Sequence, residues 1–105
     1  MIIHGVVHLK ALPGSPSNSL GLDEITKLAQ IDVENLYTAG VDGIIIENFG
    51  DVPFVKNDIS KRTLASFTSV VQKLEINSDL KVGINVLRND GIAALSIAEA
   101  TNSDF

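Results

Sequence analysis

Along the chain, short apolar segments alternate with longer segments in which apolar residues recur with a helical period. Short apolar segments, each containing a glycine, recur about every forty residues, at positions 2–9, 42–47 and 81–87. Each is followed by a polar stretch and then by a segment in which apolar residues recur with a helical period. The pattern predicts three strands alternating with three helices. The predicted helices begin near residue 23, near residue 61 and near residue 91.

Residues suited to helix ends flank the predicted helices. Residues 23–24, both acidic, lie where the helix dipole favours negative charge at the start of the first helix. Gly40 is the expected end of that helix, because glycine commonly adopts the left-handed conformation just past a helix. Ser60 and Asp90 are the predicted N-caps of the second and third helices. Residues 104–105 look like the start of a fourth strand.

Strand–helix alternation of this kind is typical of right-handed β–α–β units and a parallel sheet. An open doubly wound sheet and a closed barrel both fit. No glycine-rich phosphate-binding motif follows any strand, which disfavours the nucleotide-binding open sheets. Inward-pointing barrel residues tend to be polar near the carboxyl ends of the strands, and His8, Glu47 and Asn85 fit this pattern. We therefore predict an α/β fold comprising the N-terminal three to three-and-a-half units of a TIM (β/α)8 barrel.

The length of the chain sets the extent of that barrel. Eight β/α units need about 250 residues, and this chain has 105. We expect residues 1–105 to form a single partial barrel domain, truncated before its fourth strand. The first and third strands would then have unpaired edges, through which two copies of the chain would be able to associate.

Amino-acid composition and charge exclude several kinds of binding partner and site. Apolar residues make up 45% of the chain and charged residues 20%, as in ordinary globular proteins. The formal net charge is −5 and no basic cluster is larger than two residues, so we expect no nucleic-acid partner. The chain has no cysteine, which excludes thiol nucleophiles and thiolate metal sites. No apolar run is long enough to span a bilayer and no signal-peptide pattern follows Met1, so we expect a cytoplasmic protein.

Three residues are the candidate catalytic groups. His8 and Glu47 lie near the ends of the first two strands, and adjacent strands are about 4.8 Å apart, so these side chains are able to share a hydrogen bond. A carboxylate can fix the tautomer of an imidazole, which would make His8 a general base or acid. Asn85 on the third strand would orient a carbonyl or hydroxyl group. The alternative is that these polar groups only satisfy one another and water.

Four residues near the same strand ends are candidate anion- or substrate-binding groups: Lys10, Asn48, Asp51 and Arg88. Lys10 opens a loop with two prolines and a glycine, whose backbone N–H groups suit an anionic group. Arg88 offers bidentate contacts to a phosphate or carboxylate. The alternative for the first loop is a plain strand-to-helix connection.

No cofactor-binding motif is evident in the sequence. A divalent metal is a weaker alternative, since His8, Glu47, Asp51 and Asp90 would form an oxygen-rich site if they converged. No tight spacing of metal ligands supports such a site, so we assign no metal ligand.

The second loop, residues 48–59, is longer than a strand-to-helix connection needs to be. Four of its side chains are apolar and costly to leave in water: Phe49, Val52, Phe54 and Val55. Such a segment could fold over the barrel mouth as a lid. It could equally pack against a neighbouring subunit, and both interpretations stay open.

Three stretches carry a family resemblance: VHLKALPGSP at 7–16, GVDGIIIENFGDVPF at 40–54 and GINVLRND at 83–90. Together they resemble the BtpA family, which includes SgcQ-type proteins, and the match runs through almost the whole chain. The resemblance implies a TIM-barrel protein of about 250 to 280 residues, of which this chain would be the N-terminal portion. Cyanobacterial members are associated with photosystem I assembly or stability at the thylakoid surface. Other members are described as predicted TIM-barrel enzymes, some near sugar-metabolism genes.

Three function hypotheses follow. The first is a small-molecule enzyme acting on a phosphorylated sugar or related anion, active at full length and inactive as this chain alone. The second is a photosystem I assembly or stability factor that acts as a binding platform, located at the thylakoid membrane if the source is cyanobacterial. The third is a phosphoribosylanthranilate isomerase-like activity. It is disfavoured because the isomerase pattern has a cysteine at the end of the first strand, where this chain has none.

Overall fold

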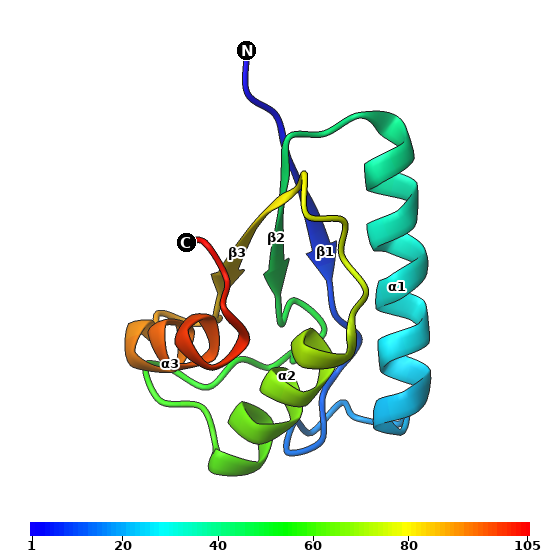
Figure 1. The fold of residues 1–105 in the computed structure, drawn as a ribbon. Helices are drawn as coiled ribbons and strands as arrows, with labels where there is room; N and C mark the ends of the chain where they lie inside the picture. The colour runs from blue at the N-terminus through cyan, green and yellow to red at the C-terminus, as the bar shows by residue number, and fades with distance from the viewer.

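The computed structural model describes all 105 residues and contains three strands and three helices in strict alternation (Figure 1). This order confirms the predicted β/α pattern. The strands are shorter than the apolar segments that predicted them: β1 and β2 begin one or two residues later, and β1 and β3 end one or two residues earlier. The elements are β1 (His4–His8), α1 (Leu22–Ala39), β2 (Gly43–Glu47), α2 (Lys61–Lys73), β3 (Lys81–Asn85) and α3 (Gly91–Thr101).

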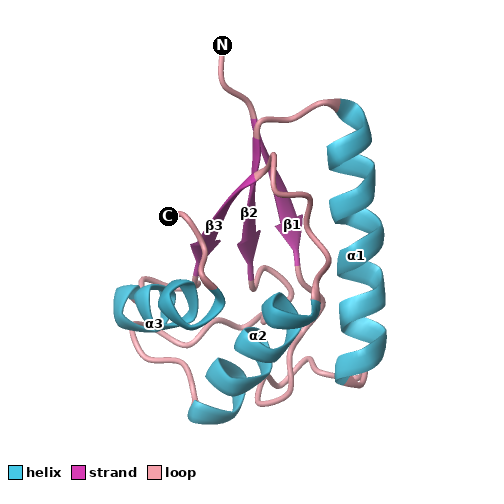
Figure 2. Ribbon diagram, viewed as in Figure 1, coloured by secondary structure: helices cyan, strands magenta, loops and turns pink.

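The three strands form one parallel sheet in the order β1-β2-β3. His8 pairs with Glu47 and Glu47 with Asn85, so the last residues of the three strands form one row across the sheet. The strands point the same way in Figure 2, and the three loops that follow them lie at one end of the sheet. This arrangement confirms the predicted α/β fold and is consistent with the N-terminal part of a TIM barrel.

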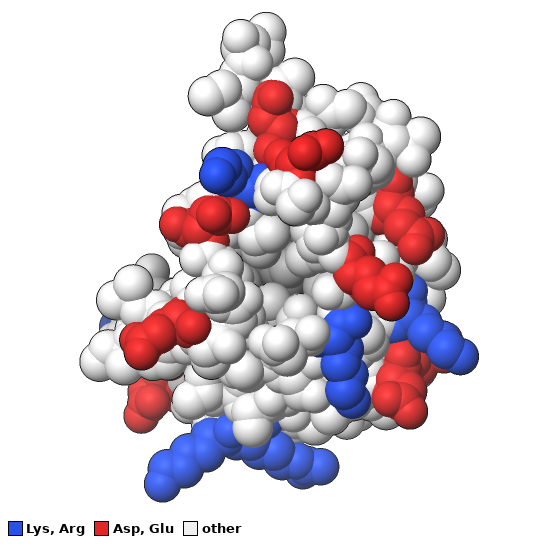
Figure 3. Space-filling model, viewed as in Figure 1, with Lys and Arg blue, Asp and Glu red and all other residues white.

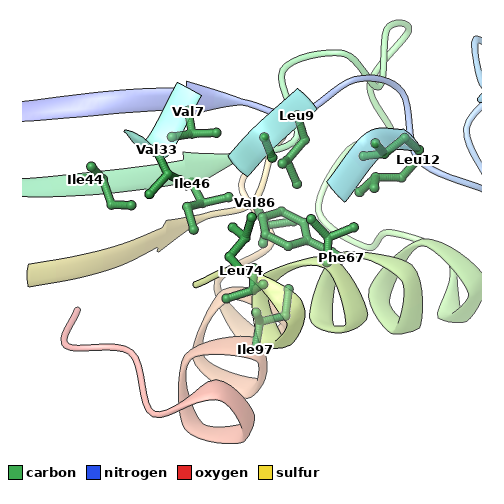
Figure 4. Close-up of a cluster of buried hydrophobic side chains, with 14 of the residues drawn as sticks. Val7, Leu9, Leu12, Val33, Ile44, Ile46, Phe67, Leu74, Val86 and Ile97 are labelled. Atoms are coloured by element: carbon green, nitrogen blue, oxygen red, sulfur yellow. The ribbon is translucent and has the colours of Figure 1, made fainter. Parts of the chain in front are cut away.

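One face of the sheet packs against all three helices. Alternation along the strands places Val7, Ile44 and Ile46 on this face, where all three are fully buried. Figure 4 shows them in one cluster with Phe67 of α2 and Ile97 of α3. The opposite face, which carries the side chains that a barrel would turn inward, has no helix over it.

The predicted helix ends are confirmed. Gly40 adopts the left-handed conformation (φ 88°), and its N–H donates to the Leu36 and Tyr37 carbonyls, which ends α1. The Ser60 hydroxyl accepts a hydrogen bond from the Thr63 N–H at 3.1 Å, as an N-cap does. Each of these signals is local in the sequence and needs no tertiary contact to be recognised.

The outer edge of β3 is not free. Phe105 donates its N–H to the Val82 carbonyl (3.1 Å) and accepts from the Ile84 N–H (2.9 Å), which is the pattern of a parallel strand pair. Residues 104–105 therefore occupy the position of a fourth strand, as their sequence suggested. The expectation of an unpaired third strand was wrong, because these last residues cover that edge. The outer edge of β1 has no partner strand, so self-association through it stays a prediction.

Candidate functional site

The row that ends the three strands brings the three candidate catalytic residues together. His8 Nε2 lies 3.0 Å from Glu47 Oε1, and Asn85 Nδ2 donates to Glu47 Oε2 at 2.8 Å. Both carboxylate oxygens of Glu47 are thus engaged by neighbours on the flanking strands. The sequence predicted this meeting from strand polarity, whereas the catalytic roles stay predictions.

Glu47 and His8 differ in exposure. The Glu47 side chain is 15% exposed and the His8 side chain 51% exposed. A carboxylate shielded in this way fixes the orientation of its hydrogen-bond donors, while the imidazole stays accessible to a ligand. When His8 is neutral and its Nε2 carries the proton, Nδ1 is unprotonated and able to accept one.

An aromatic ring lies flat against the His8 imidazole. The Phe49 ring is stacked on it with centroids 4.4 Å apart and planes 17° apart. Phe54 meets Phe49 edge-on, with centroids 6.3 Å apart. The sequence pattern placed both phenylalanines in a lid or interface but did not indicate that Phe49 contacts His8, since residues of a loop have no fixed register with a strand.

Asn48, a candidate substrate-binding residue, is only 1% exposed. Its Nδ2 donates to the Leu87 carbonyl at 2.9 Å, and its Oδ1 accepts from the Leu87 N–H at 2.6 Å. The side-chain amide thus pairs with both backbone polar groups of Leu87 and joins the second loop to the third loop, residues 86–90.

Asp51, another candidate substrate-binding residue, is also buried. Its Oδ1 accepts from the Leu12 N–H at 2.7 Å, and its Oδ2 accepts from Asn48 Nδ2 at 3.2 Å. Burial raises the pKa of the Asp51 carboxyl above its ordinary value, although the hydrogen bonds from Leu12 and Asn48 act in the opposite direction. Asp51 joins the second loop to the first.

Asp90 combines two structural contacts. Its Oδ1 accepts from the Ala93 N–H at 3.0 Å, which confirms it as the N-cap of α3. Its Oδ2 accepts from the Ile59 N–H at 2.8 Å and so ties the second loop to α3. No three acidic or histidine side chains come close enough to share a metal ion, so the convergence considered for His8, Glu47, Asp51 and Asp90 does not occur.

The four candidate anion-binding residues fall into two groups. Lys10 and Arg88 are exposed, and neither forms an ion pair. Lys10 lines an open hollow of about 260 Å³ between the first and second loops. Asn48 and Asp51 instead line a small cavity of about 30 Å³ beneath the loops, which has room for about one water molecule. On the face shown in Figure 3, basic and acidic side chains are interspersed and form no single-sign field.

Comparison with known proteins identifies the family. The family model described as "BtpA family" matches residues 1–105, the whole chain. The chain belongs to the BtpA family. The resemblance seen in the three sequence stretches is thereby confirmed.

Relatives of this BtpA-family chain come from archaea, bacteria and an animal. An uncharacterised protein of Pyrococcus abyssi is 46% identical over 96% of this chain and 39% of its own length. The photosystem I biogenesis protein BtpA of Synechocystis is 41% identical over 96% of this chain and 35% of its own. An uncharacterised mitochondrial protein of Caenorhabditis elegans is 34% identical over 99% of this chain and 39% of its own. No solved structure matches the chain.

The BtpA-family chain spans about two fifths of the length of these relatives. All three residues of the His8–Glu47–Asn85 row lie within this part. None of its helices is long and apolar enough to cross a membrane.

Proposed function

We propose that this chain supplies the N-terminal part of an enzyme active site that performs general acid–base chemistry on a small anionic substrate, such as a phosphorylated sugar. The observation that supports the proposal most strongly is the Glu47 carboxylate, held between His8 Nε2 at 3.0 Å and Asn85 Nδ2 at 2.8 Å. The three residues lie at the carboxyl ends of parallel strands, where barrel enzymes build their active sites.

In this proposal His8 moves the proton. Glu47 accepts the hydrogen bond from Nε2 and keeps the neutral imidazole in one tautomer, so that Nδ1 receives a proton from the substrate and returns it later in the cycle. Glu47 also stabilises the imidazolium that forms after this transfer. Asn85 uses one amide hydrogen on Glu47, and its second hydrogen and its oxygen are available to a substrate hydroxyl or carbonyl.

Lys10 and Arg88 would hold the anionic group of the substrate. Both side chains are exposed and free of acidic partners, so binding an anion breaks no existing ion pair. Arg88 suits a phosphate through two parallel hydrogen bonds, whereas Lys10 acts as a point charge. In a complete barrel the later strands commonly add the main phosphate site. We therefore expect turnover from a protein of the relatives' length and none from these 105 residues alone.

The experiment is a turnover assay of the full-length gene product against a panel of phosphorylated sugars. We expect His8→Ala and Glu47→Gln each to lower kcat/KM by about a hundredfold or more, the usual contribution of a general acid or base. His4→Ala is the matched control, because His4 lies on the same strand and the same face but pairs with Gly43 at the opposite end of the sheet. Unchanged turnover in both site variants would remove the proposed roles.

A binding platform is the second candidate function. Phe49, Val52 and Val55 are each about half exposed, and apolar side chains gathered on one loop suit a protein partner. One relative is named for photosystem I biogenesis. If the chain acts in this way, Phe49→Ser and Phe54→Ser will abolish capture of a photosystem I subunit, while His8→Ala will leave capture intact.

A further inference from the structure

The contacts of His8 come from two directions. Glu47 Oε1 lies 3.0 Å from its Nε2, and the Phe49 ring lies parallel to its imidazole with centroids 4.4 Å apart. A hydrogen bond through one ring nitrogen fixes the position of that atom but lets the ring turn about the bond. A ring stacked on the imidazole fixes its plane. The two contacts together fix the direction in which Nδ1 points.

The backbone around Phe49 is held on both sides. On the strand side, the Leu9 N–H donates to the Glu47 carbonyl at 2.9 Å and the Leu9 carbonyl accepts from the Gly50 N–H at 3.0 Å. Asn48, the residue between Glu47 and Phe49, is anchored to Leu87 by two further hydrogen bonds. The Phe49 ring is therefore carried by an ordered backbone, which is what a positioning residue requires.

Burial in the hydrophobic core does not explain the position of the Phe49 ring. It is 50% exposed, whereas Phe67 in the core is fully buried, so Phe49 gains only part of the stabilisation that a buried ring provides. Its aromatic contacts are a parallel stack on His8 and an edge-type contact with Phe54. These contacts confine the ring to the position over the imidazole.

We propose that Phe49 is a positioning residue that holds the His8 imidazole in the plane its proton transfer needs. This inference rests on the proposed function, because it assigns the support of the same catalytic group. Phe49 neither gives nor takes a proton in this scheme and acts only through His8. An aromatic ring at position 49 is required, since an aliphatic side chain of similar size offers no flat face to the imidazole.

The test compares Phe49→Leu with Phe49→Tyr in the full-length protein, with Ile31→Ala as the control for an exposed apolar residue away from the site. Carbon-13 relaxation of the labelled His8 ring measures its order without any need for a substrate. We expect Phe49→Leu to lower the order parameter of the ring and to lower kcat about tenfold with KM nearly unchanged. Phe49→Tyr should keep both quantities at their parent values, and Ile31→Ala should alter neither.

The two proposals fail in different ways. If the His8 ring keeps its order in Phe49→Leu, the positioning role is overturned, whatever the kinetics. If the ring loses its order and yet turnover is unchanged in both Phe49→Leu and His8→Ala, the catalytic role of His8 is overturned, while its orientation by Phe49 is confirmed. If Phe49→Tyr lowers kcat as much as Phe49→Leu does, the positioning role is also overturned, because an aromatic ring at position 49 then does not preserve activity.

Discussion

Asn48 forms two hydrogen bonds with the backbone of Leu87. Its Oδ1 accepts from the Leu87 N–H at 2.6 Å, and its Nδ2 donates to the Leu87 carbonyl at 2.9 Å. This pair continues the β2–β3 hydrogen-bond ladder past the ends of both strands. With Asp51 and Asp90 it fixes three loops relative to one another, so the end of the sheet that carries Glu47 is preorganised.

Asn48→Ala removes both hydrogen bonds to the Leu87 backbone and the one to Asp51 Oδ2. It leaves the N–H and the carbonyl of Leu87 without partners in a partly buried position. We expect a loss of about 2–4 kcal/mol in the free energy of unfolding, since each lost bond costs about 1 kcal/mol and unsatisfied groups add to it. Urea unfolding measures the loss. Asn35→Ala, at an exposed position of α1, is the control and should lie within about 0.5 kcal/mol of the parent. Equal stabilities for the two variants would contradict the assigned role of Asn48.

Asp51→Asn tests the buried carboxyl through its pH dependence. Because burial raises the pKa of Asp51 in the folded state, the folded chain binds the proton more tightly than the unfolded chain does. The stability from this group is therefore complete below about pH 4, near the unfolded pKa, and is lost as the pH rises through the raised folded pKa. The cost of Asp51→Asn should thus be larger at about pH 3.5 than at about pH 7.

Urea unfolding of parent and variant at both pH values measures this difference. Asp58→Asn, in an exposed part of the second loop, corrects for the general effect of removing one negative charge. A cost of Asp51→Asn that grows as the pH rises would show that the carboxyl is stabilised in its ionised form and would overturn the assignment.

Gly50 allows the first and second loops to approach closely. A Cβ at this position would lie 2.5 Å from the Leu9 carbonyl oxygen and 2.6 Å from the Ala11 nitrogen, both backbone atoms that cannot yield easily. We expect Gly50→Ala to destabilise the fold by about 1–3 kcal/mol and to disturb the His8–Phe49 stack beside it. Gly91→Ala is the matched control, because its Cβ meets no atom within 4 Å. Equal unfolding temperatures for Gly50→Ala and Gly91→Ala would contradict the close packing of the two loops.

The sequence predicted the elements well because their signals are local. Helical and strand periods, Ser60, Asp90 and Gly40 each report a contact made within a few residues. The meeting of His8 with Glu47 was also predictable, since parallel strands that start in register end in register.

Other features depend on contacts between loops, which no local pattern encodes. Asn48 and Asp51 were interpreted as ligand-binding because they follow a strand end, and only the packing of three loops shows that both are buried. The stack of Phe49 on His8 is of the same kind. Each depends on where a loop lies after folding, which periodicity and residue type do not specify.

The central claim is that Glu47 holds His8 with the proton on Nε2 and with Nδ1 free. Nitrogen-15 NMR of the labelled His8 ring at about pH 8 tests it directly. The account predicts a protonated Nε2 and an unprotonated Nδ1 in the parent protein, and a mixture of the two tautomers in Glu47→Leu. A proton on Nδ1 in the parent, or the same pattern in parent and variant, would contradict it.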